Sequence, residues 1–85
     1  MEVVLHRSFK KKFKKLPREI QLRFYERVEM LIKNRNNIVL NNHRVDRVFP
    51  DCRSINISGN YRAIFKEEGE TMVFLKIGRH SELYR

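Results

Sequence analysis

Hydrophobic positions follow a helical spacing in the first third of the chain and a two-residue spacing in the last third. The β-branched run Val3-Val4-Leu5 predicts a short first strand. Apolar side chains then recur at helical spacing over residues 9–16, directly behind Ser8, which is a good N-cap residue. Lysines cover the other side of this segment. We therefore expect a strand followed by a basic amphipathic helix.

A second helix is predicted after Pro17, a residue that suits the first helical turn. One apolar stripe marks it and should pack on a sheet. The stripe consists of Ile20, Phe24, Val28, Leu31 and Ile32. The pattern fades at residues 34–37, and a polar connection occupies residues 36–51. A connection this long inside a compact domain is either functional or contains a short strand that the pattern does not place, which draws attention to His43.

Period-two patterning predicts three further strands, over residues 53–58, 61–66 and 71–77, separated by turns at residues 59–60 and 67–70. The fold class we expect is α+β in the order β-α-α-β-β-β. It is a small, mainly antiparallel sheet with two helices on one face and the other face partly open. The position of the first strand in the sheet is not decided by the pattern.

The alternation also predicts which side chains share a face of the sheet. The odd-numbered set of the last strand is Val73, Leu75 and Ile77, and we expect odd positions in all three strands to face the helices. The other face would then carry Asn56, Arg62 and Lys76. That face is expected to form a basic groove.

The 85 residues are expected to form one domain, residues 1–85, with a net charge of +9 from 19 Lys and Arg against 10 Asp and Glu. The charge is uneven: residues 1–35 hold eleven basic against four acidic side chains, and the rest hold eight against six. Such charge attracts nucleic acid or an acidic partner protein. The single Cys52 indicates a reducing compartment, and no apolar run approaches the roughly 18 residues of a membrane span. We expect a cytoplasmic protein with no membrane partner.

Metal-dependent chemistry is not indicated, because the three histidines are scattered and no His-Glu-x-x-His or cysteine-rich spacing occurs. No phosphate-binding glycine pattern is present either, and we expect no cofactor. Metal-free cleavage of RNA needs a base for the 2′-OH, positive charge against the developing phosphorane and an acid for the 5′-oxygen. Histidine, Arg, Lys and a stacking aromatic ring supply these functions. The side chains that could do so are His43, Arg62, Lys76, Arg79, His80 and Tyr84.

Three segments resemble the RelE/ParE superfamily of toxins from type II toxin-antitoxin systems, and most closely its YafQ branch. They are Leu-Asn-Asn-His ending at His43, the strand pair with Tyr61-Arg62 at the start of its second strand, and the ending His80-Ser81-Glu82-Leu83-Tyr84. The resemblance implies a RelE-like fold and a ribosome-dependent, metal-independent mRNA endonuclease that cuts in the A site. It also implies an acidic antitoxin, through which alone the protein would reach operator DNA.

The resemblance also implies roles for individual residues. His43 and His80 match catalytic histidines, and Tyr84 stands where the family has an aromatic residue close to the substrate. Lys76 falls where the branch has a catalytic arginine, so that the charge is kept and the bidentate fork is lost. The expected catalytic residues are His43, Arg62, Lys76, His80 and Tyr84. The expected RNA- or phosphate-binding residues are Lys10, Lys11, Lys14, Arg53, Asn56, Asn60 and Arg79.

Two positions depart from the branch. Asn56 stands where the branch has a further histidine and Asn60 where it has an aspartate, and an asparagine cannot act as a proton-transfer base. The leading hypothesis therefore has His43 as general base and His80 as general acid. A second hypothesis is a ParE-type inhibitor of DNA gyrase, although such proteins commonly lack the His/Tyr ending. A third is a catalytically degenerate member that acts only as an antitoxin-bound corepressor.

Overall fold

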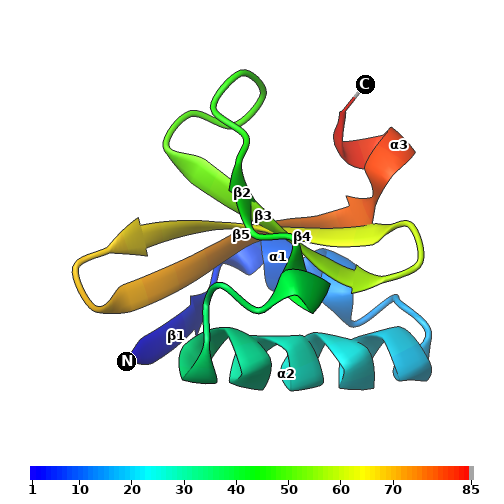
Figure 1. The fold of residues 1–85 in the computed structure, drawn as a ribbon. Helices are drawn as coiled ribbons and strands as arrows, with labels where there is room; N and C mark the ends of the chain where they lie inside the picture. Colours follow the sequence, from blue (N-terminus) through cyan, green and yellow to red (C-terminus); the bar gives the residue numbers. More distant parts are fainter. Residues whose placement is uncertain (85) are drawn as a thin grey trace.

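The computed structural model describes residues 1–84, which form a sheet with two helices on one face (Figure 1). This confirms the expected α+β class. In chain order the elements are β1 (Glu2–Leu5), α1 (Arg7–Phe13), α2 (Arg18–Lys33), the 3-10 turn η1 (Ile38–Leu40), β2 (His43–Arg44), β3 (Cys52–Ser58), β4 (Tyr61–Glu68), β5 (Thr71–Arg79) and α3 (His80–Leu83).

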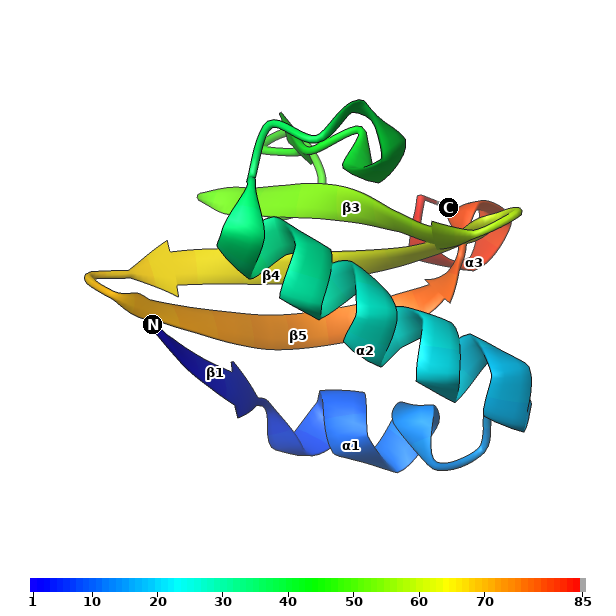
Figure 2. The same cartoon turned by 60° about the horizontal axis from the view of Figure 1, so that its bottom comes forward.

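The sheet has five strands in the order β1-β5-β4-β3-β2. β1 lies parallel to β5, and the remaining pairs are antiparallel. Where β1 ends, α1 continues along the same edge of β5 (Figure 2). The backbone N–H of His6 donates to the carbonyl of Phe74 at 2.9 Å, and the hydroxyl of Ser8 donates to the carbonyl of Leu75 at 3.1 Å. The edge position of β1, which the pattern left open, is thus fixed by hydrogen bonds to β5.

Aromatic rings from both helices and the sheet form the main core. Phe24 packs against Phe9 with ring centroids 5.0 Å apart and against Phe74 at 5.1 Å. The Phe65 ring lies 5.2 Å from that of Phe74. Such tilted and edge-on pairs are the arrangements that the ring quadrupole favours. The predicted stripe of α2 is buried except for Ile32, which is 47% exposed because it lines a hollow at the end of α2 instead of the sheet.

Two β-bulges change which residues face the helices. In β5 the register passes from Ile64↔Lys76 to Phe65↔Phe74, so that Leu75 is the extra residue. In β3 the register skips Ile57. A bulged residue leaves the ladder, and here a helix side chain bonds to its carbonyl in each case. Ser8 donates to Leu75, and Nε of Arg27 donates to Ile57 at 3.1 Å.

The bulge in β5 makes the expected facing of this strand wrong. Phe74 and Met72 face the helices and belong to the main core, whereas Leu75 packs on the opposite side. Ile77 faces the helices as expected. Lys76 lies opposite Ile64 and away from the helices, as predicted, but only because the bulge restores the alternation after Phe74.

Other boundaries also differ from the prediction: β3 begins at Cys52, β4 runs to Glu68 and β5 runs to Arg79. α1 begins at Arg7 and ends at Phe13, and its N-cap is His6, whose Nδ1 accepts from the backbone N–H of Ser8 at 3.1 Å. Ser8 is not the cap because its hydroxyl is used on Leu75. The long connection contains η1 and β2, a strand too short to show any periodicity.

The face of the sheet away from α1 and α2, here called the outer face, is partly covered. The loop between β2 and β3 and the helix α3 both lie on this side (Figure 1). They contribute Val45, Phe49, Leu83 and Tyr84 to a second apolar cluster with Cys52, Ile64 and Leu75. Phe49 meets Tyr84 with ring centroids 6.3 Å apart, so the loop and α3 touch above the sheet. Within residues 1–84, no helix is long and apolar enough to span a bilayer.

Candidate functional site

Cross-strand pairing arranges the outer face in rows. One row runs from His43 through Ser54 and Ile64 to Lys76, and the next contains Asn56, Arg62 and Gly78. Directly paired residues point to the same face, so three predicted cationic or catalytic side chains share this surface. With strands about 4.8 Å apart, the backbones of His43 and Lys76 lie about 14 Å apart, and Arg62 lies in the next row on β4, a strand between theirs. The predicted groups are therefore spread across the sheet.

His43 presents one ring nitrogen for proton transfer. Its Nδ1 lies 2.8 Å from the carbonyl oxygen of Asn41, a residue in the left-handed region with φ of 45°. A carbonyl can only accept, so Nδ1 carries the proton in the neutral ring and Nε2 keeps its lone pair. The side chain is exposed. The local backbone thus holds neutral His43 in the tautomer that can act as a base through Nε2.

Arg62 is partly bound to its own turn. Its Nη1 donates to the carbonyls of Gly59 at 2.8 Å and Tyr61 at 3.0 Å. Among residues 1–84, neither Nε nor Nη2 makes a hydrogen bond, and these donors can receive an anion. Asn56 lies directly opposite Arg62. Its Oδ1 is buried and has no hydrogen-bond partner among residues 1–84. Lys76 is exposed and forms no ion pair with residues 1–84.

α3 brings His80 and Tyr84 together. The backbone N–H of His80 donates to the carbonyl of Asn60 at 2.8 Å, which fixes the start of α3 on the β3–β4 turn. The His80 and Tyr84 rings lie with centroids 4.5 Å apart and planes at 37°. His80 is exposed, whereas Tyr84 is half-buried against Phe49. A histidine and an aromatic ring therefore lie side by side at the edge of the outer face.

Glu82 and Gly78 hold α3 on the sheet. Oε1 of Glu82 accepts from the backbone N–H of Arg79 at 2.8 Å, and Oε2 accepts from Nζ of Lys12 at 3.0 Å. The bond from Arg79, followed by that from Lys12, keeps the pKa of Glu82 below its usual value. A Cβ on Gly78 would stand 3.2 Å from Oε1 of Glu82 and 3.7 Å from Leu83. The absence of a side chain at Gly78 allows α3 this close.

Five of the predicted binding residues lie elsewhere. Lys10, Lys11 and Lys14 surround a hollow of about 350 Å³ with Arg7 on the exposed side of α1. Arg53 is on the same face of β3 as Ile55, which is the helix side. Its Nε donates to Oδ1 of Asn42 at 2.7 Å. The guanidinium of Arg79 stacks over the Tyr61 ring, with its Cζ 5.7 Å from the centroid. None of these is in the row of Asn56 and Arg62.

Sequence reasoning missed the residues that support the site. Lys12 was one lysine among five, and its contact with Glu82 crosses 70 positions of the chain. Glu82 stands three residues after Arg79, the spacing at which a helix's third residue can return to its N-cap N–H, and this was a usable signal. Phe49 carried no signal, because its contact with Tyr84 depends on the fold of an irregular loop.

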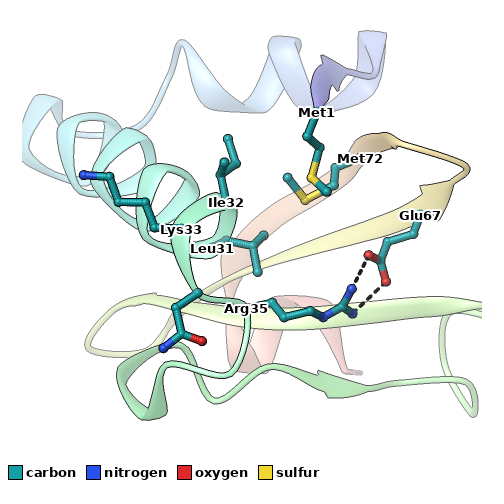
Figure 3. A pocket seen from close by; sticks show the side chains of 8 residues that line it. Met1, Leu31, Ile32, Lys33, Arg35, Glu67 and Met72 are labelled. Atoms are coloured by element: carbon teal, nitrogen blue, oxygen red, sulfur yellow. Dashed lines mark hydrogen bonds and ion pairs between the residues drawn. The ribbon is translucent and has the colours of Figure 1, made fainter.

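Other features of the surface carry none of the predicted residues. A hollow of about 290 Å³ lies between the end of α2 and the β4–β5 hairpin, with Met1, Ile32 and Met72 around it (Figure 3). Arg35 and Glu67 form a bidentate pair beside it at 2.7 and 2.9 Å.

In the described part of the chain, neither the cysteine nor a metal site adds to the chemistry of this surface. Burial raises the pKa of the Cys52 thiol, which belongs to the second apolar cluster, and a raised pKa disfavours the nucleophilic thiolate. Within residues 1–84, no three His, Cys, Asp or Glu side chains gather as a metal site would require.

One known protein family matches almost the whole chain. Residues 3–84 match the family described as the ParE toxin of type II toxin-antitoxin systems, parDE. The chain belongs to this toxin family. Among curated proteins no sequence matches.

Solved structures of the same superfamily share the fold. YafQ from E. coli strain BL21(DE3) superposes with a TM-score of 0.82 at 16% identity, over 99% of this chain and 98% of that one. The RelB-RelE antitoxin-toxin complex from Methanococcus jannaschii gives 0.74 at 20% identity, over 95% and 94%. The YoeB/ParE toxin from Agrobacterium tumefaciens gives 0.76 at 9% identity, over 94% and 99%. These likenesses establish a RelE-like fold.

Proposed function

We propose that this toxin is a ribosome-dependent, metal-independent mRNA endonuclease whose substrate lies across the outer face. The supporting observation is the common face of His43, Arg62 and Lys76, with His80 and Tyr84 at its edge. ParE-family membership alone does not choose between RNA and gyrase as a target. The paired His80 and Tyr84 favour RNA, because an imidazole beside a stacking ring suits a nucleotide.

In the proposed reaction, Nε2 of His43 removes the proton from the 2′-OH of the nucleotide before the cut. The 2′-oxygen attacks phosphorus, and the bond from phosphorus to the 5′-oxygen breaks. The protonated His80 donates its proton to that leaving oxygen. The products are a 2′,3′-cyclic phosphate and a free 5′-OH, and no oxidant, reductant or further reactant is needed.

Positive charge stabilises the phosphorane in this scheme. Arg62 offers Nε and Nη2, since Nη1 is already held by the turn, and Lys76 adds a point charge from the neighbouring strand. Tyr84 stacks on a nucleobase, and Asn56 presents its amide beside Arg62. Asn60 acts through its backbone, which anchors His80. Lys10, Lys11 and Lys14 are assigned to ribosomal or messenger phosphates outside the cleavage centre.

The test is a reconstituted translation reaction with a defined mRNA, followed by primer extension. The wild-type protein should stop synthesis and leave cuts at A-site codons, and His80→Gln and His43→Gln should abolish the cuts. His6→Asn is the matched control, because His6 is an exposed histidine that caps α1 and lies outside the rows of His43, Arg62 and Lys76. Intact mRNA under stalled translation would overturn the proposal.

A gyrase inhibitor of the ParE type is the second candidate, because the family that the chain matches is described as the ParE toxin. A supercoiling assay on purified gyrase separates the two: the proposal requires no inhibition at concentrations that cut mRNA. Under the third reading, a corepressor without activity, both assays would be negative.

We also propose a partner, an acidic antitoxin that binds this chain in the cytoplasm and carries it to operator DNA. The net charge of +9 and the antitoxin-bound state of the RelE relative support this assignment. Complex formation should weaken as salt rises, because much of the attraction is electrostatic. Co-purification of the toxin with the product of an adjacent acidic reading frame, at low and high salt, tests it.

A further inference from the structure

We propose that Glu82 is a positioning residue. Held between the amine of Lys12 and the backbone N–H of Arg79, it sets the place of the His80–Tyr84 pair on the outer face. The inference rests on the proposed function and adds a part to its site. It also gives Lys12 a role different from that of Lys10, Lys11 and Lys14, the lysines of α1 that the sequence assigned to phosphates.

The geometry of α3 gives the first argument. A four-residue helix has almost no stability of its own, because nucleation is unfavourable and few backbone bonds repay it. Its place must come from contacts with the rest of the chain. At its start, the N–H of His80 donates to the carbonyl of Asn60, and Glu82 packs closely on Gly78. The two carboxylate oxygens of Glu82 accept from Arg79 and Lys12.

The two bonds of Glu82 have different partners and different effects. The bond to Arg79 N–H closes the first turn of α3 from within, as a third-position glutamate does in a capping box. The bond to Lys12 ties that turn to α1, which is itself fixed on β5 by Ser8. One carboxylate therefore fixes both the shape of α3 and its position relative to the sheet.

Lys12 differs from the other lysines of its helix. Its side chain is 42% exposed and points to Glu82, whereas Lys10, Lys11 and Lys14 gather around the hollow with Arg7. An ion pair this exposed adds little to global stability. Its effect should appear in the placement of the rings, since displacing a catalytic group by about 1 Å can slow a reaction on the order of a hundredfold.

Three variants separate the contributions in the cleavage assay. Lys12→Met keeps the aliphatic stem and removes the amine, and it should lower the single-turnover cleavage rate about threefold, within the range of one exposed pair. Glu82→Ala removes both bonds and should lower it on the order of tenfold or more. Glu82→Gln keeps an oxygen for Arg79 and should fall between them. Ribosome binding should stay unchanged in all three, because none of these changes alters Arg7, Lys10, Lys11 or Lys14.

Lys33→Met is the matched control. It breaks another exposed Lys–Glu pair, to Glu29 at 3.3 Å within α2, and should leave the rate unchanged. The double variant Lys12→Met with Glu82→Gln should be no slower than the slower single variant, because the two residues act through one contact. Equal losses in Lys12→Met and Lys33→Met, or losses in ribosome affinity instead of rate, would overturn the inference.

A spectroscopic readout tests the inference even if the protein does not cut mRNA. In the wild type, the His80 ring protons should show a ring-current shift from Tyr84 and cross-peaks to it, as the 4.5 Å separation requires. Glu82→Ala should reduce both while the core signals stay unchanged, and Lys33→Met should preserve them. Unchanged His80 signals in Glu82→Ala would refute the positioning role, whereas absent cleavage with these signals altered would refute only the proposed function.

Discussion

The bulge at Leu75 makes a prediction that separates the observed strand from the regular one. In a regular strand Leu75 would lie in the main core and Phe74 outside it, and the structure has the reverse. Phe74 is fully buried among Phe9, Phe24 and Phe65, whereas Leu75 is half-buried in the outer cluster. Alanine at each position should therefore have unequal effects on the free energy of unfolding.

The magnitudes follow from burial. A buried Phe replaced by Ala lowers the free energy of unfolding by about 3–5 kcal/mol, and a partly exposed Leu by about 2 kcal/mol or less. A domain of this length has a total of about 4–13 kcal/mol, at roughly 0.05–0.15 kcal/mol per residue. Phe74→Ala thus removes roughly a quarter of the stability or more. Leu75→Ala should leave the protein folded and weaken the apolar packing around Tyr84 in the second cluster.

Equilibrium unfolding in urea, followed by circular dichroism, measures the difference. With a urea dependence of about 1–2 kcal/mol per molar, the midpoint of Phe74→Ala should lie roughly 0.5 M or more below that of Leu75→Ala. The comparison requires equal slopes, and thermal unfolding provides a second measure. A lower midpoint for Leu75→Ala would refute the bulge and with it the route by which Lys76 reaches the outer face.

Three further predictions concern charge and close packing. Changing Lys10, Lys11 and Lys14 together to Gln should weaken ribosome binding and reduce the slope of log affinity against log salt by roughly 2–3, measured by sedimentation at several salt concentrations; an unchanged slope would remove these lysines from the interface. Arg35 holds the pKa of Glu67 below its usual value, mainly through their hydrogen bonds. Stability from this pair is therefore present above the unfolded pKa of about 4.3 and is lost as pH falls further, so Glu67→Gln should flatten the urea midpoint against pH below about 4.3. Gly78→Ala should press on Glu82 and shift α3, and should thus slow cleavage without lowering ribosome affinity; a wild-type rate would show that the 3.2 Å approach is not constraining.

The helices and the order of the long elements could be predicted because they rest on local patterns. The stripe of α2 and the alternation of β3 and β4 are periodic over several residues, and the predicted helix-side residues Ile55, Ala63 and Phe65 do lie in the main core. β2 has two residues and α3 has four, too few for any period to show. Both elements are stabilised by tertiary contacts with residues distant in the chain, and a local sequence pattern does not reveal such contacts.

The bulges could not be predicted for the same reason. The carbonyl of Leu75 is satisfied by Ser8, 67 positions earlier in the chain, and that of Ile57 by Arg27, 30 positions earlier. Lys76 was placed on the correct face through an argument that ignored the bulge. Arg53 is different, because its odd position already indicated the helix side and its charge alone suggested phosphate. Arg79 lay beyond the predicted last strand, and β5 extends to include it.

The pairing of β1 with β5 has a consequence for synthesis. Glu2 lies opposite Thr71, so the two strands that meet are separated by 69 positions of sequence (71 minus 2). Long-range parallel pairing of this kind forms slowly, since a large loop must close before any bond repays it. Until residues 71–79 are available, a growing chain has no edge for β1, and α1 lacks its hydrogen bond from Ser8 to β5. A nascent toxin therefore cannot assemble its site on the ribosome that is making it until this strand has emerged.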